Sequence, residues 1–192
     1  MSDLTNDVWI LKDERIKKFY DDYKTHIDYI MDNNKSVMPY HDTNHLIGVG
    51  YIMDRIFGCP PVGVIAGLYH DFNHIGYTPD YINIENTLNT LPSYVTPVIK
   101  SIIRGSEYDP KDPSPYINDH DIVGWCIKRL RDADQLYGIV FGMYDCIEDG
   151  LYKEIGGNMS PEEFRKRNVS YHKNLIFYTD RAKYIREQFN KG

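Results

Sequence analysis

An all-α fold is the class that the sequence predicts, for three reasons. Apolar residues recur at steps of three and four along much of the chain, whereas no segment alternates between apolar and polar residues as a strand would. Proline and glycine interrupt this pattern at intervals that separate one helix from the next. The length of 192 residues is enough for one domain with a substantial core, and no internal repeat divides it.

The first helix is expected after a short N-terminal arm. Residues 1–12 are predicted to be loosely held, although the apolar side chains at 9–11 can pack against the body. Residues 13–34 place apolar side chains at steps of three and four and predict an amphipathic helix.

Two helices should follow. Either Asp42 or Thr43 suits the N-cap of the second helix. Pro61 suits the first turn of the third helix, which we expect to span 62–74 and to end at Gly76.

The middle of the chain predicts shorter elements. Residues 77–83 are expected to form a loop across the mouth of the site, and 84–89 a short helix. Residues 95–104 carry an apolar face and predict a further helix. Three prolines in 105–118 indicate an irregular surface loop.

Helical patterns return in the last third of the chain. Residues 119–150 predict a long helix, with a kink near Gly138 or Gly142. Ser160, followed by a proline and by Glu163, has the pattern of a capping box and opens a closing helix.

Composition and charge narrow the class of protein. Hydrophobic residues make up 42% and charged residues 26%, as in ordinary globular domains. The net charge of −6 argues against extended nucleic acid or a membrane surface as a partner, but not against a small phosphate substrate. Three widely spaced cysteines, with neither a long apolar stretch nor a secretory signal, indicate a cytoplasmic protein. The oligomeric state is not predicted.

Histidine and aspartate gather around the third predicted helix. His70 and Asp71 follow an apolar run, and polar side chains in an apolar setting must be paired or must bind a metal ion. Asp134 lies on an apolar stripe of the long predicted helix, whereas Asp132 lies with its charged residues. A carboxylate on an apolar stripe needs a compensating cation. We therefore predict that Asp134 is a buried metal ligand. Asp132 is predicted to be either a solvated acid or a residue that contacts the ligands and not the ion.

Short motifs in the chain resemble the HD metal-dependent phosphohydrolases, a superfamily of all-helical proteins. Residues 40–45 (Tyr-His-Asp-x-x-His) resemble the Tyr-His-Asn-x-x-His signature of the 3′,5′-cyclic nucleotide phosphodiesterases, and residues 70–76 resemble their His-Asp-x-x-His-Pro-Gly. Small predicted HD hydrolases share a similar pattern. The resemblance covers about residues 39–180 and implies one HD-type domain. It does not extend to the purine-binding glutamine of the phosphodiesterases, because neither Gln135 nor Gln188 is suitably placed.

The resemblance implies a metal centre. Its ligands would be His45, His70, Asp71 and Asp134, with Asp71 bridging to a second ion held mostly by water. The implied cofactor is one or two divalent ions, and the sequence does not distinguish Mn, Mg, Zn, Fe or Co.

The resemblance also implies catalytic roles. A hydroxide between the ions would attack phosphorus, and His41 would protonate the leaving oxygen as the general acid. His74 would orient the nucleophile or the water shell of the second ion, and Glu85 would assist there.

The predicted function is the hydrolysis of a nucleotide phosphodiester, either a cyclic mononucleotide or a cyclic or short oligonucleotide. A nucleotidase acting on a mono- or triphosphate is the close alternative. A di-iron oxygenase would need further histidines between His74 and Asp134, where the chain offers His120. A zinc protease would need a glutamate where Asp42 stands, and a non-catalytic binding module would not need the full ligand set.

Overall fold

The computed structural model describes residues 8–36, 38–76, 78–107, 112, 117–118, 120–142 and 144–190, and for residues 144–147 and 172 it describes the backbone alone. Within these residues the fold is all-α, as the sequence predicts, and contains no sheet. The α-helices are α1 Lys17–Asn33, α2 Thr43–Tyr51, α3 Pro61–Tyr69, α4 Asp80–Thr90, α5 Pro97–Arg104, α6 Ile122–Phe141, α7 Tyr144–Ile155, α8 Pro161–Asn174 and α9 Asp180–Phe189. A 3-10 helix, η1 Trp9–Lys12, precedes them, and a π-helix, η2 Ile52–Ile56, extends α2.

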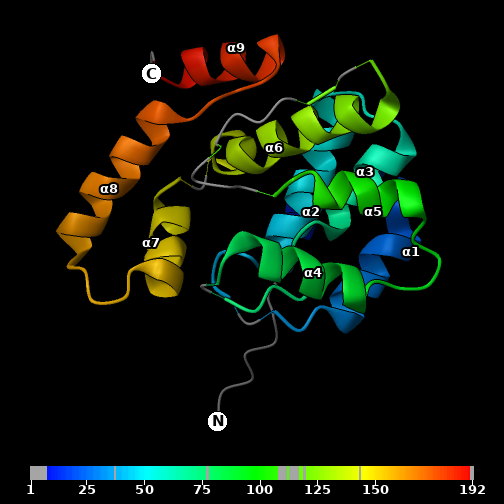
Figure 1. The fold of residues 1–192 in the computed structure, drawn as a ribbon, viewed down its shortest axis with the longest axis horizontal. Helices are drawn as coiled ribbons and strands as arrows, with labels where there is room; N and C mark the ends of the chain where they lie inside the picture. The colour runs from blue at the N-terminus through cyan, green and yellow to red at the C-terminus, as the bar shows by residue number, and fades with distance from the viewer. Residues whose placement is uncertain are drawn as a thin grey trace.

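Helices α2 and α3 lie side by side at the centre, and α1, α5 and α6 pack around them (Figure 1). Glycines on α2 permit this close approach. A Cβ atom at Gly50 would lie 2.6 Å from a methyl carbon of Leu68 on α3, and one at Gly48 would collide with the ring of Tyr137 on α6. The central pair therefore packs almost backbone to backbone, and this places the start of α2 beside the end of α3.

The C-terminal helices are arranged differently. Figure 1 shows α7 and α8 as a hairpin at one side of the body, while α9 packs along α6. The expected break in the long helix falls at Gly142, which adopts a left-handed conformation (φ 65°) and separates α6 from α7. The predicted capping box of Ser160 and Glu163 is confirmed at the start of α8. The separate helix α9 has no counterpart in the prediction.

Two predicted boundaries are wrong, whereas the packing allowed for the apolar residues 9–11 is observed. The third helix, expected to reach His74, ends at Tyr69. The loop expected over 77–83 is shorter, because α4 already begins at Asp80. Within the predicted arm, η1 packs against the body with Ile10 fully buried, whereas residues 1–7 lie outside the described residues.

Tertiary contacts explain why α3 stops early. Asn73 takes a positive φ of 59°, and the side-chain oxygen of Asn34 accepts the hydrogen bond from its backbone N–H at 2.9 Å. Side chains of α4 donate to the carbonyls of the turn: Thr87 to Phe72 at 2.9 Å and Asn86 to Asn73 at 2.7 Å. These bonds satisfy backbone groups that a longer helix would pair internally.

None of the described helices combines the length and the apolar character that crossing a bilayer needs.

Candidate metal centre

Helix α2 presents His45 from its first turn. Asp42 caps the helix as predicted, with its carboxylate accepting a hydrogen bond from the His45 backbone N–H at 2.9 Å. The imidazole of His45 is fully buried, and the ring centroids of Tyr40 and Tyr137 lie 4.8 and 5.0 Å from its own. This packing fixes the orientation of the His45 ring.

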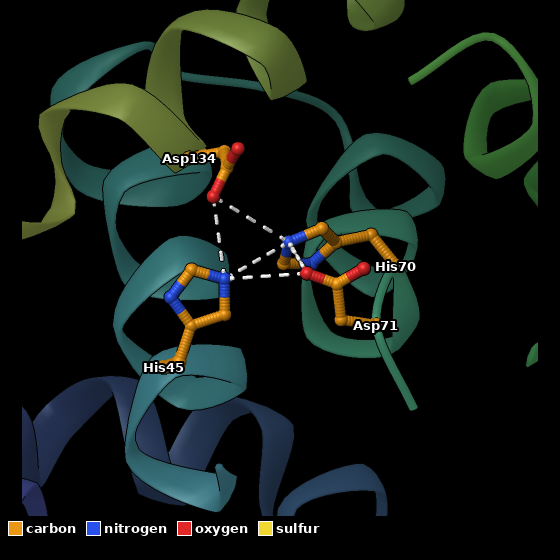
Figure 2. Close-up of side chains that lie close together, drawn as sticks. All are labelled: His45, His70, Asp71 and Asp134. Carbon is orange, nitrogen blue, oxygen red and sulfur yellow. Dashed lines mark hydrogen bonds and ion pairs between the residues drawn. The ribbon is translucent and has the colours of Figure 1, made fainter. Parts of the chain in front are cut away.

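His70 and Asp71 lie in the turn after α3, and Asp134 projects from α6 toward them. Figure 2 shows the four side chains converging on one point from three elements. His45 Nε2 lies 3.2 Å from His70 Nε2, 3.5 Å from Asp71 Oδ2 and 3.3 Å from Asp134 Oδ1. His70 Nε2 lies 3.0 Å from Asp71 Oδ2 and 3.9 Å from Asp134 Oδ1. The structure thus brings together all four predicted ligands.

Hydrogen bonding sets the ligand atom of His70. Its Nδ1 lies 2.9 Å from the carbonyl oxygen of Gly67, which can only accept a hydrogen bond, so Nδ1 carries the proton. The lone pair of Nε2 is then directed into the cluster, which is the usual arrangement for a metal-binding histidine.

The charges of the cluster are strongly coupled. Burial disfavours the charged form of His70, but Asp71 and Asp134 raise its pKa well above the ordinary value. Burial also opposes ionisation of Asp71, yet His70 and His45 hold the pKa of this carboxyl well below its usual range. The two carboxylates thus stabilise positive charge at the centre of the cluster. A divalent cation can supply the same charge without protonating the imidazoles.

The spacing of the donor atoms fits an ion. Ligands bound at about 2.1 Å in a tetrahedral arrangement lie roughly 3.4 Å from one another. The ligand atoms of the four residues all lie within 4.8 Å of one another, and the separations given above run from 3.0 to 3.9 Å. His45, His70, Asp71 and Asp134 can therefore hold a metal ion, although two imidazoles and two carboxylates do not identify it.

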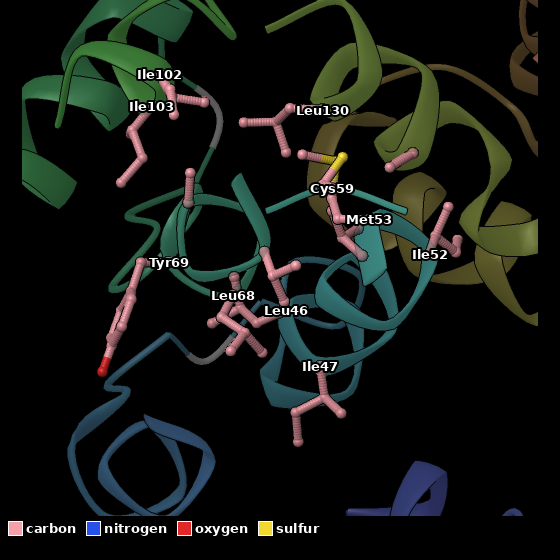
Figure 3. Close-up of a cluster of buried hydrophobic side chains, with 14 of the residues drawn as sticks. Leu46, Ile47, Ile52, Met53, Cys59, Leu68, Tyr69, Ile102, Ile103 and Leu130 are labelled. Carbon is pink, nitrogen blue, oxygen red and sulfur yellow. The ribbon is translucent and has the colours of Figure 1, made fainter. Parts of the chain in front are cut away.

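The packed core supports this arrangement. Leu46, next to His45, is fully buried, as are Leu68 and Tyr69, which directly precede His70 (Figure 3). Close-packed side chains leave the adjacent backbone little freedom, so the ligands are held near their positions without an ion.

His41 lies beside the cluster and is held by a residue that the sequence analysis missed. Its Nδ1 is 2.7 Å from Oε2 of Glu154, whose other oxygen accepts hydrogen bonds from the backbone N–H groups of Tyr40 and His41. The Glu154 side chain is only 1% exposed. Burial opposes its ionisation, but the bond to His41 keeps the pKa of Glu154 below its ordinary value. No motif marks Glu154, which lies 113 residues from His41 in the chain.

His74 is stacked on His41. The two ring centroids are 4.1 Å apart and the ring planes differ by 12°. Burial lowers the pKa of His74 to about 4, so this imidazole is neutral at neutral pH. Its Nδ1 accepts a hydrogen bond from the backbone N–H of Gly76 at 3.2 Å. The structure thus places His74 next to the predicted general acid.

Glu85, predicted to assist catalysis, lies elsewhere. Its side chain is 51% exposed and forms an ion pair with Arg104 at 2.7 Å. The prediction placed Glu85 near the start of a short helix, but α4 begins five residues earlier, at Asp80. On the longer helix Ile84 turns toward the cavity and Glu85 turns toward α5.

Asp134, and not Asp132, lies in the ligand cluster, as predicted. The relative burial of the two side chains is the reverse of the prediction. Asp134 reaches the cluster with a side chain that is 31% exposed. Asp132, expected to be solvated, is 1% exposed and accepts hydrogen bonds from the backbone N–H groups of Tyr178 and Thr179 and from the Thr179 hydroxyl. Asp134 lies in the cluster that could hold a metal ion, as predicted, whereas the expected solvation of Asp132 is wrong.

The cluster opens into a large cavity. This cavity has a volume of about 790 Å³ and is lined by His41, His70, Asp71, His74 and Asp134 on one side. Side chains of α6, α7 and α8 form most of the rest of its wall, together with Asp80 and Ile84 of α4 and residues that follow α8. Pockets of this size accommodate small organic molecules.

Comparisons with protein-family models, with curated proteins and with solved structures found no match for the chain. Its candidate metal centre is therefore defined by the geometry of the four ligands and of the cavity beside them.

Proposed function

We propose that the protein is a metal-dependent phosphohydrolase that cleaves a nucleotide phosphodiester. One observation carries this proposal: a preformed site with two histidines and two aspartates lies on the wall of the same cavity as an imidazole held by a buried carboxylate. The first group suits a divalent cation, and the second suits a proton donor.

In this proposal His45, His70, Asp71 and Asp134 bind the ion. A divalent cation held there supplies charge neutralisation at phosphoryl oxygens and favours ionisation of an attacking water. The low pKa of Asp71 keeps it anionic and available as a ligand over the neutral range. Tight packing around His45 keeps this ligand in place as substrate enters and leaves.

His41 serves as the general acid. The Glu154 carboxylate accepts a hydrogen bond from the Nδ1–H group of His41, so Nε2 is the nitrogen that can give a proton to the leaving oxygen. His41 Nε2 lies 3.9 Å from Asp71 Oδ2, which places the donor at the edge of the ligand cluster. His74, neutral and stacked on His41, limits the movement of that ring.

The presence of a proton donor beside the cluster favours a phosphodiester over a phosphomonoester as the substrate. The leaving group of a nucleotide diester is an alkoxide of high basicity, which needs protonation as it departs. A nucleotidase on the same site remains the second candidate, because the ligand cluster alone would serve either reaction. The di-iron alternative loses the support of His120, which is exposed and not part of the ligand group found among the described residues.

A substrate screen tests the proposal. The purified protein would be assayed with Mn²⁺, Mg²⁺ and Co²⁺ against cyclic mononucleotides, cyclic dinucleotides and mononucleotides. Products would be separated so that ring opening or linkage cleavage is distinguished from release of free phosphate.

The expected result is metal-dependent formation of a nucleoside monophosphate or linear dinucleotide, and loss of that activity in Asp71→Ala. Free phosphate from mononucleotides alone would favour the nucleotidase. Activity that survives Asp71→Ala would contradict both reactions at this site.

A further inference from the structure

A carboxamide without a hydrogen-bond partner in the described part of the chain lies on the wall of the cavity. Asn168 on α8 is 8% exposed and lines the same cavity as the ligand cluster, yet it forms no hydrogen bond within the part of the chain that the structure describes. The other buried asparagines there are paired: Asn44 with Asp42 and with the backbone of Ile10, and Asn83 with the backbone of Gly76.

The amide atoms of Asn168 are not among the buried polar atoms left unpaired in the described residues, so they reach the open space of the cavity, where a ligand can pair with them. A carboxamide presents one acceptor and two donors in a plane. This arrangement matches a ligand edge on which a donor and an acceptor stand side by side, as they do on the edge of a nucleobase.

The surroundings of Asn168 suit a flat ring. Phe164, one helical turn before it, and Tyr171, three residues after it, lie on the same side of α8 and also line the cavity. Apolar side chains of α6, including Leu130 and Ile139, line the wall as well. Aromatic and aliphatic surfaces of this kind accept the faces of a base while the amide binds its edge.

We propose that Asn168 recognises the nucleobase of the substrate through paired hydrogen bonds to the edge of the base. The inference rests on the proposed function for the position of the phosphate at the metal centre. The volume of about 790 Å³ leaves room for both parts of one nucleotide. In this arrangement α2, the turn after α3, and α6 bind the reacting group, whereas α8 selects the base.

Binding measurements test the assignment without requiring turnover. Isothermal titration of the Mn²⁺-supplemented protein would compare AMP, GMP, CMP and UMP with ribose 5-phosphate, which has the same phosphate but no base. We expect at least one nucleotide to bind about tenfold more tightly than ribose 5-phosphate. Asn168→Ala should bring the two within about threefold, and Asn168→Asp, which keeps the shape but replaces donors by an acceptor, should change the order of preference among the bases.

Two variants separate recognition from a structural role. Asn168→Leu removes an unpaired amide from an apolar wall, so we expect an unchanged or higher melting temperature together with lost discrimination between nucleotide and ribose 5-phosphate. Asn174→Ala is the matched control, because that asparagine is exposed and its amide already donates to the carbonyl of Ser170. It should keep the full preference for nucleotides.

The outcomes are distinguishable from a failure of the proposed reaction. Equal binding of nucleotides and ribose 5-phosphate by the wild type, or undiminished preference in Asn168→Ala, would overturn the role of Asn168. A fall in melting temperature of Asn168→Leu with the preference for nucleotides retained would assign the residue to the fold and overturn it as well. A protein that hydrolyses no phosphodiester but shows the expected discrimination would refute the reaction and support the base contact.

Discussion

Two aspartates of α6, Asp132 and Asp134, lie two residues apart in the sequence but in different environments. Asp134 faces the end of α3, and its carboxylate interacts with the buried imidazoles of His45 and His70. Asp132 faces the segment between α8 and α9 and accepts three hydrogen bonds from Tyr178 and Thr179. The first carboxylate lies among groups that could hold a metal ion, whereas the second is bound by N–H and O–H groups of the chain.

The difference shows that burial alone does not identify a ligand. Asp132 is the more buried of the two side chains, yet its donors are N–H and O–H groups that satisfy it completely. Asp134 is more exposed, but its neighbours are other potential metal ligands. The chemical nature of the partners therefore separates a site from a structural contact, and the following substitutions test that distinction.

The largest effect is expected from Asp134→Asn. This change removes a charged ligand while keeping the shape of the side chain, so the affinity for Mn²⁺ should fall by at least about 100-fold and activity should fall with it. Titration calorimetry measures the first quantity. The rise in melting temperature on adding Mn²⁺, expected for the wild type because the ion binds only the folded state, should disappear in the variant. Unchanged Mn²⁺ affinity would show that Asp134 is not a ligand.

Glu154→Gln should have the next largest effect, on the proton donor rather than on the ion. We expect kcat to fall by about 10- to 100-fold for a cyclic nucleotide, because the imidazolium of His41 loses its anionic partner. Hydrolysis of bis(p-nitrophenyl) phosphate, whose leaving group needs no proton, should fall much less. Equal losses on both substrates would argue that Glu154 only shapes the site.

The same substitution changes the response of the fold to acid. The pKa of Glu154 in the folded protein lies below its ordinary value of 4.5, so its ionised form stabilises the fold above that pH. This contribution is lost as the pH falls through the lower folded pKa. Below about pH 4.5 the free energy of unfolding should therefore decline more steeply in the wild type than in Glu154→Gln, as measured by urea titration at several pH values.

Asp132→Asn should affect stability and leave the metal centre intact. The amide nitrogen that replaces one oxygen would face donors at Thr179, so hydrogen bonds that dock the start of α9 are lost. We expect the free energy of unfolding to fall by about 2 kcal/mol, measured by denaturant titration. In the folded variant the affinity for Mn²⁺ should stay within about threefold of the wild type. A larger loss of affinity would mean that the two carboxylates are coupled.

The smallest effect is expected from Glu85→Gln. Because this side chain is half exposed and paired with Arg104, its removal should change kcat and the free energy of unfolding by little, with less than about 1 kcal/mol lost in stability. A large fall in kcat would restore the role that the sequence suggested for Glu85.

Local patterns predicted some features of the molecule well. Asp42 as a helix cap and the capping box at Ser160 follow from short-range spacing, and the structure confirms them. The same kind of reasoning predicted that Asp134, and not Asp132, lies in the cluster with His45 and His70. Features set by distant contacts escaped prediction. The end of α3 at Tyr69 depends on bonds from Asn34 and from α4.

The partners of polar groups were the hardest to foresee. Nothing near Glu154 in the sequence indicates that it meets His41, since the two residues lie on segments brought together only by the complete fold. Asp132 was misjudged for the same reason: its donors come from residues 178 and 179, beyond the end of α8.

Different helices supply the ligand cluster and much of the cavity wall, and this separation has a consequence for the evolution of such a protein. All four residues of the candidate metal centre come from α2, the turn after α3, and α6, while α8 supplies only wall residues such as Asn168. Under the proposed function, replacements on α8 would therefore alter which molecule is accepted without disturbing the reaction at the metal centre. We would expect relatives that keep the cluster and differ on this helix to share the proposed reaction and to differ in the substrates that they accept.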